Sequence, residues 1–207
     1  IAGDIVTSTA AIVSPTYSTS GNLNAGSYAQ STSSLAGADA SNYTLTAFTT
    51  PTNNYVVNQL ALTGATIAAS GSSYGSPLNR GAVSFGNIVA GDVVTSTASV
   101  NTSTLSSSGN PIVGSYTQTA GALSGTDAAN YSFAGYTTPT ANYTINPLVL
   151  TGSITASDKV YDATPAANIA SRSLTGVFSG DTVSYTGGTA SFADKNAGTA
   201  KTVSAAG

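Results

Sequence analysis

The chain has 207 residues and carries little charge: 6% of its residues are charged, against about 25% in an ordinary soluble domain. Its formal net charge is −3, its acids are eight aspartates, and it contains no histidine, glutamate, cysteine or methionine. These absences exclude a Ser–His–Asp triad, a histidine or thiolate metal site and a glutamate general base. We therefore predict that the chain is not an enzyme and has no catalytic, cofactor-binding or metal-binding residues.

The sequence of the N-terminal part of the chain is repeated further along the chain. Residues 3–64 align without a gap with residues 91–152, at a constant offset of 88 residues, and 33 of the 62 pairs are identical. A period of this length is typical of a repeated structural module. We predict three domains: a partial repeat at 1–62, a complete repeat at 63–150 and a divergent partial repeat at 151–207. Ile1 corresponds to Val89, so we expect the chain to begin inside a module and to be part of a longer array.

Within the repeats, apolar residues alternate with a period of two, which is typical of strands. In chain order, the pairs that share a face are Tyr43 and Leu45, Val83 and Phe85, Tyr131 and Phe133, Tyr143 and Ile145, and Val183 and Tyr185. Gly-, Asn-, Asp- and Ser-rich turns separate these runs about every eight to twelve residues. The pattern predicts an all-β fold in which each repeat is an Ig-like β-sandwich and the modules form a linear array.

One short helical turn is predicted in each of the first two repeats. Asp39 and Asp127 precede short Ala-rich segments, and we expect their side chains to cap these turns. The turns leave a second fold open, in which each repeat is a β-grasp-like module with one short helix.

The repeats join through short apolar segments, Leu60–Gly64 and Leu148–Gly152, without a flexible linker. A strand that continues across the boundary would couple neighbouring modules and limit bending. Neighbouring modules of the same chain are therefore expected partners. Open sheet edges could also accept a strand from another copy of the chain.

The third repeat carries a series of spaced sequence words. Lys159–Thr164 reads KVYDAT, Gly180–Asp181 reads GD, and Phe192–Val203 reads FADKNAGTAKTV. This series resembles the YDG domain of very large bacterial surface proteins, in which a glycine usually stands at the position of Ala163. Earlier in the chain, Tyr74–Gly75 followed by Ser-Pro-Leu resembles the related MBG domain of the YGX type.

The resemblance to filamentous-haemagglutinin-like adhesins implies an extracellular structural segment, at the bacterial cell surface or in a secreted matrix, acting as a stalk or filament unit without catalysis. The chain has no Cys or Met, which suits exposure to oxidants. It also has no basic residue over 1–79 and 81–158, which suits exposure to proteases that cleave after Lys or Arg. The alternative function is an adhesive module that binds glycans or mucin. Exposed tyrosines such as Tyr136 would stack on sugar rings, and repetition would multiply weak contacts.

Charge and hydropathy limit the other partners and ligands. The five basic residues form no cluster, which argues against nucleic acid, and no apolar run approaches the roughly eighteen residues of a membrane span. Calcium is the one ion that the composition leaves open. Asp158 with Asp162, or Asp181 across the sheet, could supply oxygen ligands for it.

Overall fold

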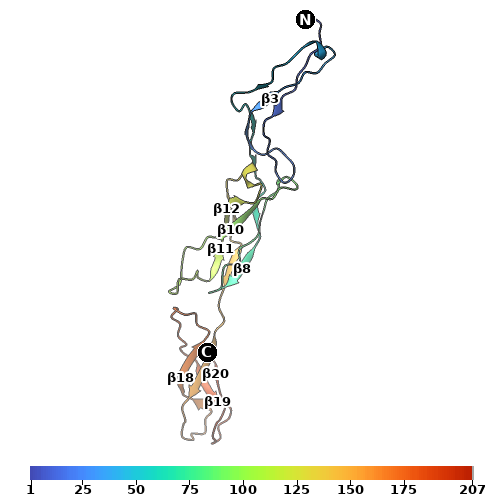
Figure 1. The fold of residues 1–207 in the computed structure, drawn as a ribbon. Helices are drawn as coiled ribbons and strands as arrows, with labels where there is room; N and C mark the ends of the chain where they lie inside the picture. Colours follow the sequence, from blue (N-terminus) through green and yellow to red (C-terminus); the bar gives the residue numbers. More distant parts are fainter. Residues whose placement is uncertain (207) are drawn as a thin grey trace. The chain divides into compact units, whose positions relative to one another are not determined.

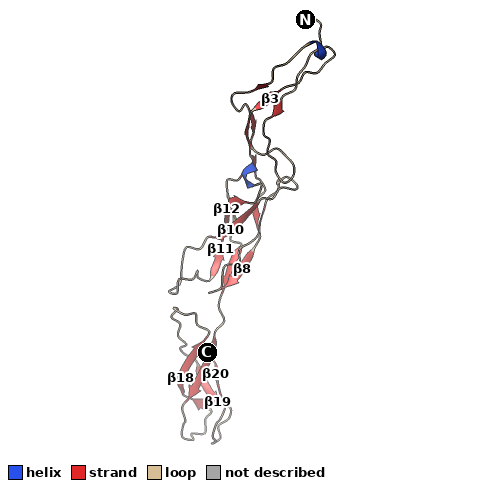
Figure 2. Ribbon diagram, viewed as in Figure 1, coloured by secondary structure: helices blue, strands red, loops and turns tan. Residues whose placement is uncertain are grey.

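The structure is a computed structural model that describes residues 1–206. It consists of short β-strands and two 3-10 turns (Figures 1 and 2), which confirms the all-β prediction. The chain forms two compact units. The first comprises Ile1–Ser70, Arg80–Asn101 and Thr117–Tyr143; the second comprises Gly71–Asn79, Thr102–Tyr116 and the chain from Thr144 onward. None of the described residues belongs to a helix with the length and apolarity that crossing a membrane requires.

Most strands have two to four residues, as expected where turn-forming residues interrupt the β-branched and aromatic runs. The first repeat contains β1 (Ala11–Ile12), β2 (Gly26–Tyr28), β3 (Gln30–Thr32), the turn η1 (Ala40–Asn42), β4 (Phe48–Thr49), β5 (Tyr55–Val57) and β6 (Leu60–Ala61). The second contains β7 (Thr66–Ile67), β8 (Ser70–Ser73), β9 (Val83–Ser84), β10 (Thr95–Val100), β11 (Gly114–Tyr116), β12 (Gln118–Ser124), the turn η2 (Ala128–Asn130), β13 (Tyr131–Ser132), β14 (Tyr136–Thr137) and β15 (Tyr143–Asn146). The third contains β16 (Thr151–Ala156), β17 (Ala166–Ala167), β18 (Ile169–Thr175), β19 (Thr189–Phe192) and β20 (Val203–Ala206).

The strand pairings recur with the period of the sequence. The antiparallel sheet β1-β3-β4 of the first repeat corresponds to β10-β12-β14 of the second. Ser31 pairs with Thr49 in one and Thr119 with Thr137 in the other, so the register is the same 88 residues later. Equal registers follow from equal alternation of inward and outward side chains, since a slip of one residue would turn every side chain to the opposite face.

The core of the first compact unit contains two clusters, built mainly from residues of the second repeat. Leu62, Val94 and Tyr131 form one, and Ile67, Ala98 and Ala120 form the other. Phe133 packs against both clusters and meets the Phe85 ring edge-to-face, with ring centroids 5.0 Å apart. Of these residues, Tyr131, Phe133 and Phe85 belong to the pairs that the period-two pattern placed on one strand face.

A buried amide joins the segments around this core. The Gln118 side chain is fully buried, and its Oε1 accepts a hydrogen bond of 2.8 Å from the Gly81 amide. Its Nε2 donates to the Ala68 carbonyl at 3.1 Å and to Asn142 Oδ1 at 3.0 Å. A buried polar group is tolerated where its bonds are made, so Gln118 fixes three segments at one point. The equivalent Gln30 in the first repeat is only partly buried.

The end of the first repeat enters the core of the second. Strand β6 pairs in parallel with β13, and Leu62, 8% exposed, packs beside Val94 and Tyr131. The two repeats therefore contact each other at this junction. The predicted continuous strand is absent: β5, β6 and β7 are separate strands.

The predicted helical turns are present as η1 and η2, directly after Asp39 and Asp127. The predicted side-chain caps are wrong. Neither carboxylate bonds to its own turn, because both aspartates have a backbone conformation outside the extended region of a capping residue. Asp39 instead accepts the Ile5 amide at 2.8 Å, and Asp127 accepts the Val93 amide at 2.7 Å.

Candidate functional site

Two loops with the sequence pattern Ser-x-Ser-Gly-Asn have the same closed conformation. In residues 18–22, the Ser18 amide donates to the Asn22 carbonyl at 2.8 Å. In residues 106–110, the Ser106 amide donates to the Asn110 carbonyl at 2.8 Å. The first and third side chains of each loop are within hydrogen-bond distance, 2.9 Å in both loops. We call these segments the serine loops; each presents hydroxyl and amide donors outward.

The first serine loop is held by two aspartates of the second repeat. The Thr19 amide donates to Asp127 Oδ1 at 3.0 Å, and the Thr19 hydroxyl contacts the other Asp127 oxygen and, at 2.8 Å, the Gly91 carbonyl. The Ser20 amide donates to Asp92 Oδ1 at 3.3 Å. Asp127 is only 3% exposed, so its charge is satisfied almost entirely by these protein donors.

Asp92 on the receiving side has a further hydrogen-bond partner. The Tyr131 hydroxyl, which itself accepts the Val89 amide at 3.1 Å, donates to Asp92 Oδ2 at 2.6 Å. A side chain at Gly91 would meet the Ser20 Cβ at 3.2 Å, so this glycine permits the loop's close approach. We call Asp92, Asp127 and Tyr131 the aspartate clasp.

Further polar contacts extend the same junction. Asn130, at the end of η2, accepts the Ala25 amide at 2.8 Å and donates to Asn24 Oδ1 at 2.9 Å. Gln59 donates to the Ala129 carbonyl at 2.9 Å. The loop, the turn and the β6 strand therefore join the first two repeats over one continuous interface.

The same contact occurs again within the second compact unit. The Ser108 amide of the second serine loop donates to Asp181 Oδ1 at 3.2 Å, and the Tyr74 hydroxyl contacts the other Asp181 oxygen. A Cβ at Gly180 would lie 3.1 Å from the Ser108 Cβ, as Gly91 lies against Ser20 in the first junction. The Gly-Asp dipeptide thus receives a serine loop in both junctions.

Electrostatics favour ionised carboxylates at both junctions. Donated bonds hold the aspartate pKa values below the ordinary value: from the Ser20 and Tyr131 side chains at Asp92, and from the Thr19 hydroxyl and the Val93 amide at Asp127. The Tyr74 hydroxyl, followed by Ser108, does the same for the pKa of Asp181. Charge-assisted hydrogen bonds, which are generally shorter and stronger than neutral ones, therefore contribute to both junctions.

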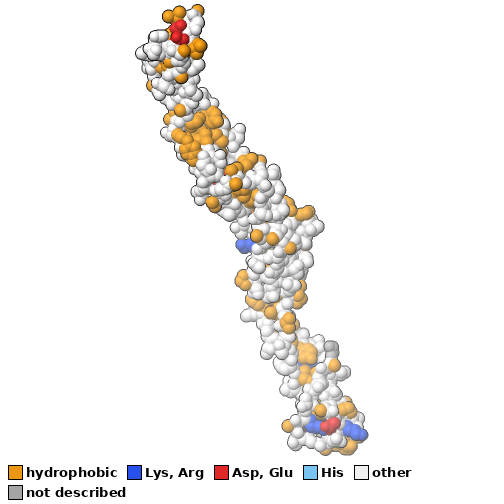
Figure 3. Space-filling model, turned by 90° about the vertical axis from the view of Figure 1, so that its right-hand side faces the viewer, with side chains coloured by type: hydrophobic (Ala, Val, Ile, Leu, Met, Phe, Trp, Pro, Cys, Tyr) orange, Lys and Arg blue, Asp and Glu red, His pale blue; other side chains and the backbone are white. Residues whose placement is uncertain are grey.

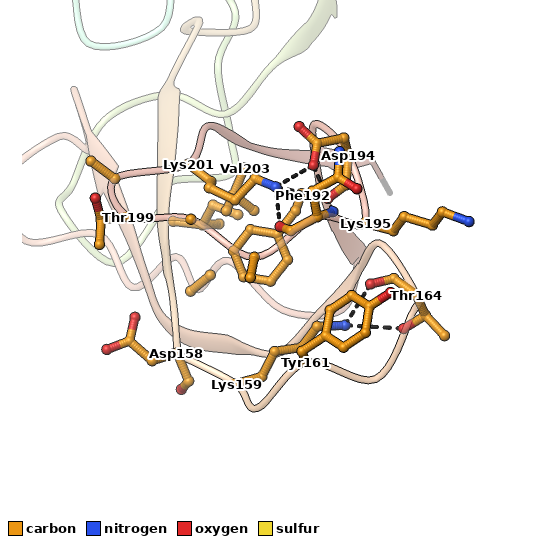
Figure 4. Close-up of a pocket in the computed structure, with 17 residues that line it drawn as sticks. Asp158, Lys159, Tyr161, Thr164, Phe192, Asp194, Lys195, Thr199, Lys201 and Val203 are labelled. Carbon is orange, nitrogen blue, oxygen red and sulfur yellow. Dashed lines mark hydrogen bonds and ion pairs between the residues drawn. The ribbon is translucent and has the colours of Figure 1, made fainter.

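A hollow in the third repeat, with a volume of 710 Å³, lies between the loop after Asp158 and the loop around Asp194 (Figure 4). The Lys159 ammonium is enclosed by Asp162 Oδ1 at 2.8 Å, Thr164 oxygens and the Ala166 carbonyl at 2.8 Å. This ammonium and the Thr164 donors lower the pKa of Asp162 to about 2.

A second lysine closes the facing loop of this hollow. Lys201 pairs with Asp194 and also donates to the Asn196 carbonyl, and its ammonium lowers the pKa of Asp194. Lys159 and Lys201 of the KVYDAT and FADKNAGTAKTV words thus stabilise their own loops.

Two of the three aspartates considered for calcium are bonded to other protein groups. Asp162 is bonded to Lys159, and Asp181 is bonded to the second serine loop and Tyr74. Asp158 is exposed. Within residues 1–206 no three metal-ligating side chains group together.

The turn after Tyr161–Asp162 stores backbone strain. Ala163 has φ 60°, a left-handed conformation that costs an L-residue about 1–2 kcal/mol. Ala163→Gly is therefore expected to raise the free energy of unfolding by about 1 kcal/mol. Urea denaturation would measure it, with Ala167→Gly in β17 as a control that should lose about 0.5–1 kcal/mol. A loss of stability in both variants would show that the turn carries no strain.

The serine loops and their partners were missed by the sequence reasoning, although a signal was present. Ser, Gly and Asn recur at the same positions of both loops, 88 residues apart. Tyr136, the tyrosine considered for sugar stacking, is instead partly buried against the core cluster of Ile67, Ala98 and Ala120.

The YDG domain family model matches residues 144–207 of this chain. No curated protein and no solved structure matches the chain.

Proposed function

We propose that this chain is a structural repeat segment of a bacterial extracellular adhesin or fibre. In this proposal the first two repeats are MBG modules of the YGX type, the third is a YDG module, and each is an Ig-like β-sandwich in a linear tandem array. The YDG match supports the assignment of the third repeat. The segment would act as a stiff stalk or filament unit, projecting other parts of the protein or building a matrix.

The observation that carries the proposal is the repeated contact between a serine loop and a Gly-Asp dipeptide. A serine loop is bound by a Gly-Asp dipeptide in each compact unit, through Asp92 in one and Asp181 in the other. Contact between neighbouring repeats is what stabilises repeat proteins whose individual cores are small. The recurrence of this contact supports a role in which the regular connection of repeats is the function.

Composition supports an extracellular, non-catalytic role. On the face shown in Figure 3, charged side chains appear only in small groups, and most of the surface is uncharged. Asp127 binds the first serine loop and Asp181 binds the second. In this proposal these carboxylates hold neighbouring repeats together. We propose the bacterial cell surface or a secreted matrix as the location, with neighbouring modules as the main partners.

Force spectroscopy tests the structural role. A load-bearing segment held at its two ends should unfold in discrete steps, and Asp127→Asn should raise the unfolding rate of the first compact unit under constant load. Asp158→Asn is the matched control, since Asp158 is exposed and outside both junctions. Smooth extension without resistance, or equal rates in the two variants, would contradict the proposal.

A glycan-binding adhesive function is the second candidate. Tyr161 is 61% exposed and lines the hollow of the third repeat, an arrangement that suits stacking on a sugar ring. A glycan array probed with the whole chain distinguishes the two. Saturable binding that Tyr161→Ala abolishes would favour this candidate over the structural role.

A further inference from the structure

The first repeat carries an aspartate clasp of its own, made of Asp4, Asp39 and Tyr43. The Tyr43 hydroxyl donates to Asp4 Oδ2 at 2.5 Å, as Tyr131 does to Asp92. Asp39 Oδ2 accepts the Ile5 amide at 2.8 Å, as Asp127 does from Val93. Each of the three residues stands 88 positions before its counterpart, so the receiving geometry is already formed.

This clasp holds no serine loop among the described residues. Nothing lies within 4 Å of a Cβ built at Gly3, whereas the corresponding Gly91 touches Ser20. Asp4 contacts the Tyr43 hydroxyl, and the Ile1 amino group lies 4.0 Å from its carboxylate. Asp39 Oδ1, the counterpart of the oxygen that receives the Thr19 amide, has no described donor in residues 1–206.

The segment beside this clasp also lacks the strand pairing that is present in the second repeat. Residues 131–132 form β13 because β6 pairs with them, but the corresponding residues 43–44 are not in a strand. Leu45, the counterpart of the partly buried Phe133, is 37% exposed. The first repeat thus presents a clasp, a free edge and an apolar side chain in the arrangement that binds the first repeat to the second.

We infer that the face formed by Asp4, Asp39, Tyr43 and Leu45 is a docking site for a further repeat of the same kind. That repeat contributes a Ser-x-Ser-Gly-Asn loop to the carboxylates and a Leu-x-Leu segment to the backbone at 43–44. The occupant is recognised by uncharged hydroxyl and amide donors, as at Asp127, and not by a cation. Both serine loops of this chain are already bound, so neither is free to fill the site. The inference rests on the proposed structural role.

The test extends the whole chain in register. Because Ile1 corresponds to Val89, joining a second copy of residues 1–88 directly before Ile1 keeps the 88-residue period. Hydrogen exchange then compares the Thr19 amide of the added block with the Thr19 amide in its original place. We expect the added Thr19 amide to exchange at the original's slow rate, and Asp39→Ala to speed it by about tenfold or more.

Two further variants keep the test decisive. Thr19→Val in the added block leaves the clasp intact and should loosen the same junction, whereas Asp158→Ala should change nothing. Fast exchange of the added Thr19 amide with Asp39 present would overturn the inference while leaving the original junction as evidence for the structural role. If Asp127→Ala also left the original Thr19 amide protected, the clasp itself, and with it the proposed function, would fail.

Discussion

Replacing Tyr143 with alanine is expected to lower the free energy of unfolding by about 3–5 kcal/mol, the range for removing a large aromatic side chain from a core. Tyr143 is fully buried, in the central strand of the sheet β11-β15-β8. Its removal would leave a cavity that short, hydrogen-bonded neighbouring strands cannot close. Urea denaturation followed by far-UV circular dichroism would measure the loss.

The first repeat supplies a matched control for this prediction. Tyr55 is the same residue 88 positions earlier, but it is 42% exposed. Its strand β5 pairs only with β2, and the structure describes no counterpart of β8 beside it. Tyr55→Ala is therefore expected to cost less than about 1 kcal/mol. Equal losses of stability in the two variants would contradict the prediction that the buried Tyr143 contributes more stability than the exposed Tyr55.

This pair of tyrosines shows what the sequence could and could not predict about the fold. Alternation predicted that Tyr143 lies in a strand, and both Tyr143 and Tyr55 do. Their burial nevertheless differs, although the local sequence is similar. Burial depends on β8, which comes from residues far along the chain, and local periodicity carries no information on which neighbouring strand covers a face.

The candidate site was predictable in its parts but not in its assembly. The turns after Asp39 and Asp127 were predicted, and the aspartates were given the local role of a cap. Asp127 instead binds Thr19, which lies 108 positions away in the chain. Capping is a local preference that a single sequence can reveal, whereas a pairing across two repeats depends on how their faces meet.

Gly75→Ala is expected to destabilise the second compact unit by about 2–5 kcal/mol, since it adds an overpacked methyl group to a strained backbone. Gly75 has φ 78°, and a Cβ there would lie 2.4 Å from the Phe178 ring. That ring packs edge-to-face on Tyr74, with centroids 6.1 Å apart, and the Tyr74 hydroxyl contacts Asp181. Moving Phe178 therefore disturbs the second junction as well as the turn.

Gly109→Ala separates the two contributions. Gly109 has φ 80°, almost the same as Gly75, but nothing lies within 4 Å of a Cβ built there. Gly109→Ala should lower the free energy of unfolding only by the cost of the left-handed conformation, about 1–2 kcal/mol. The difference between the two variants in urea denaturation then measures the contact with Phe178 alone. A difference near zero would show that the Tyr74–Phe178 pair can move without cost, and that Asp181 holds the serine loop independently of it.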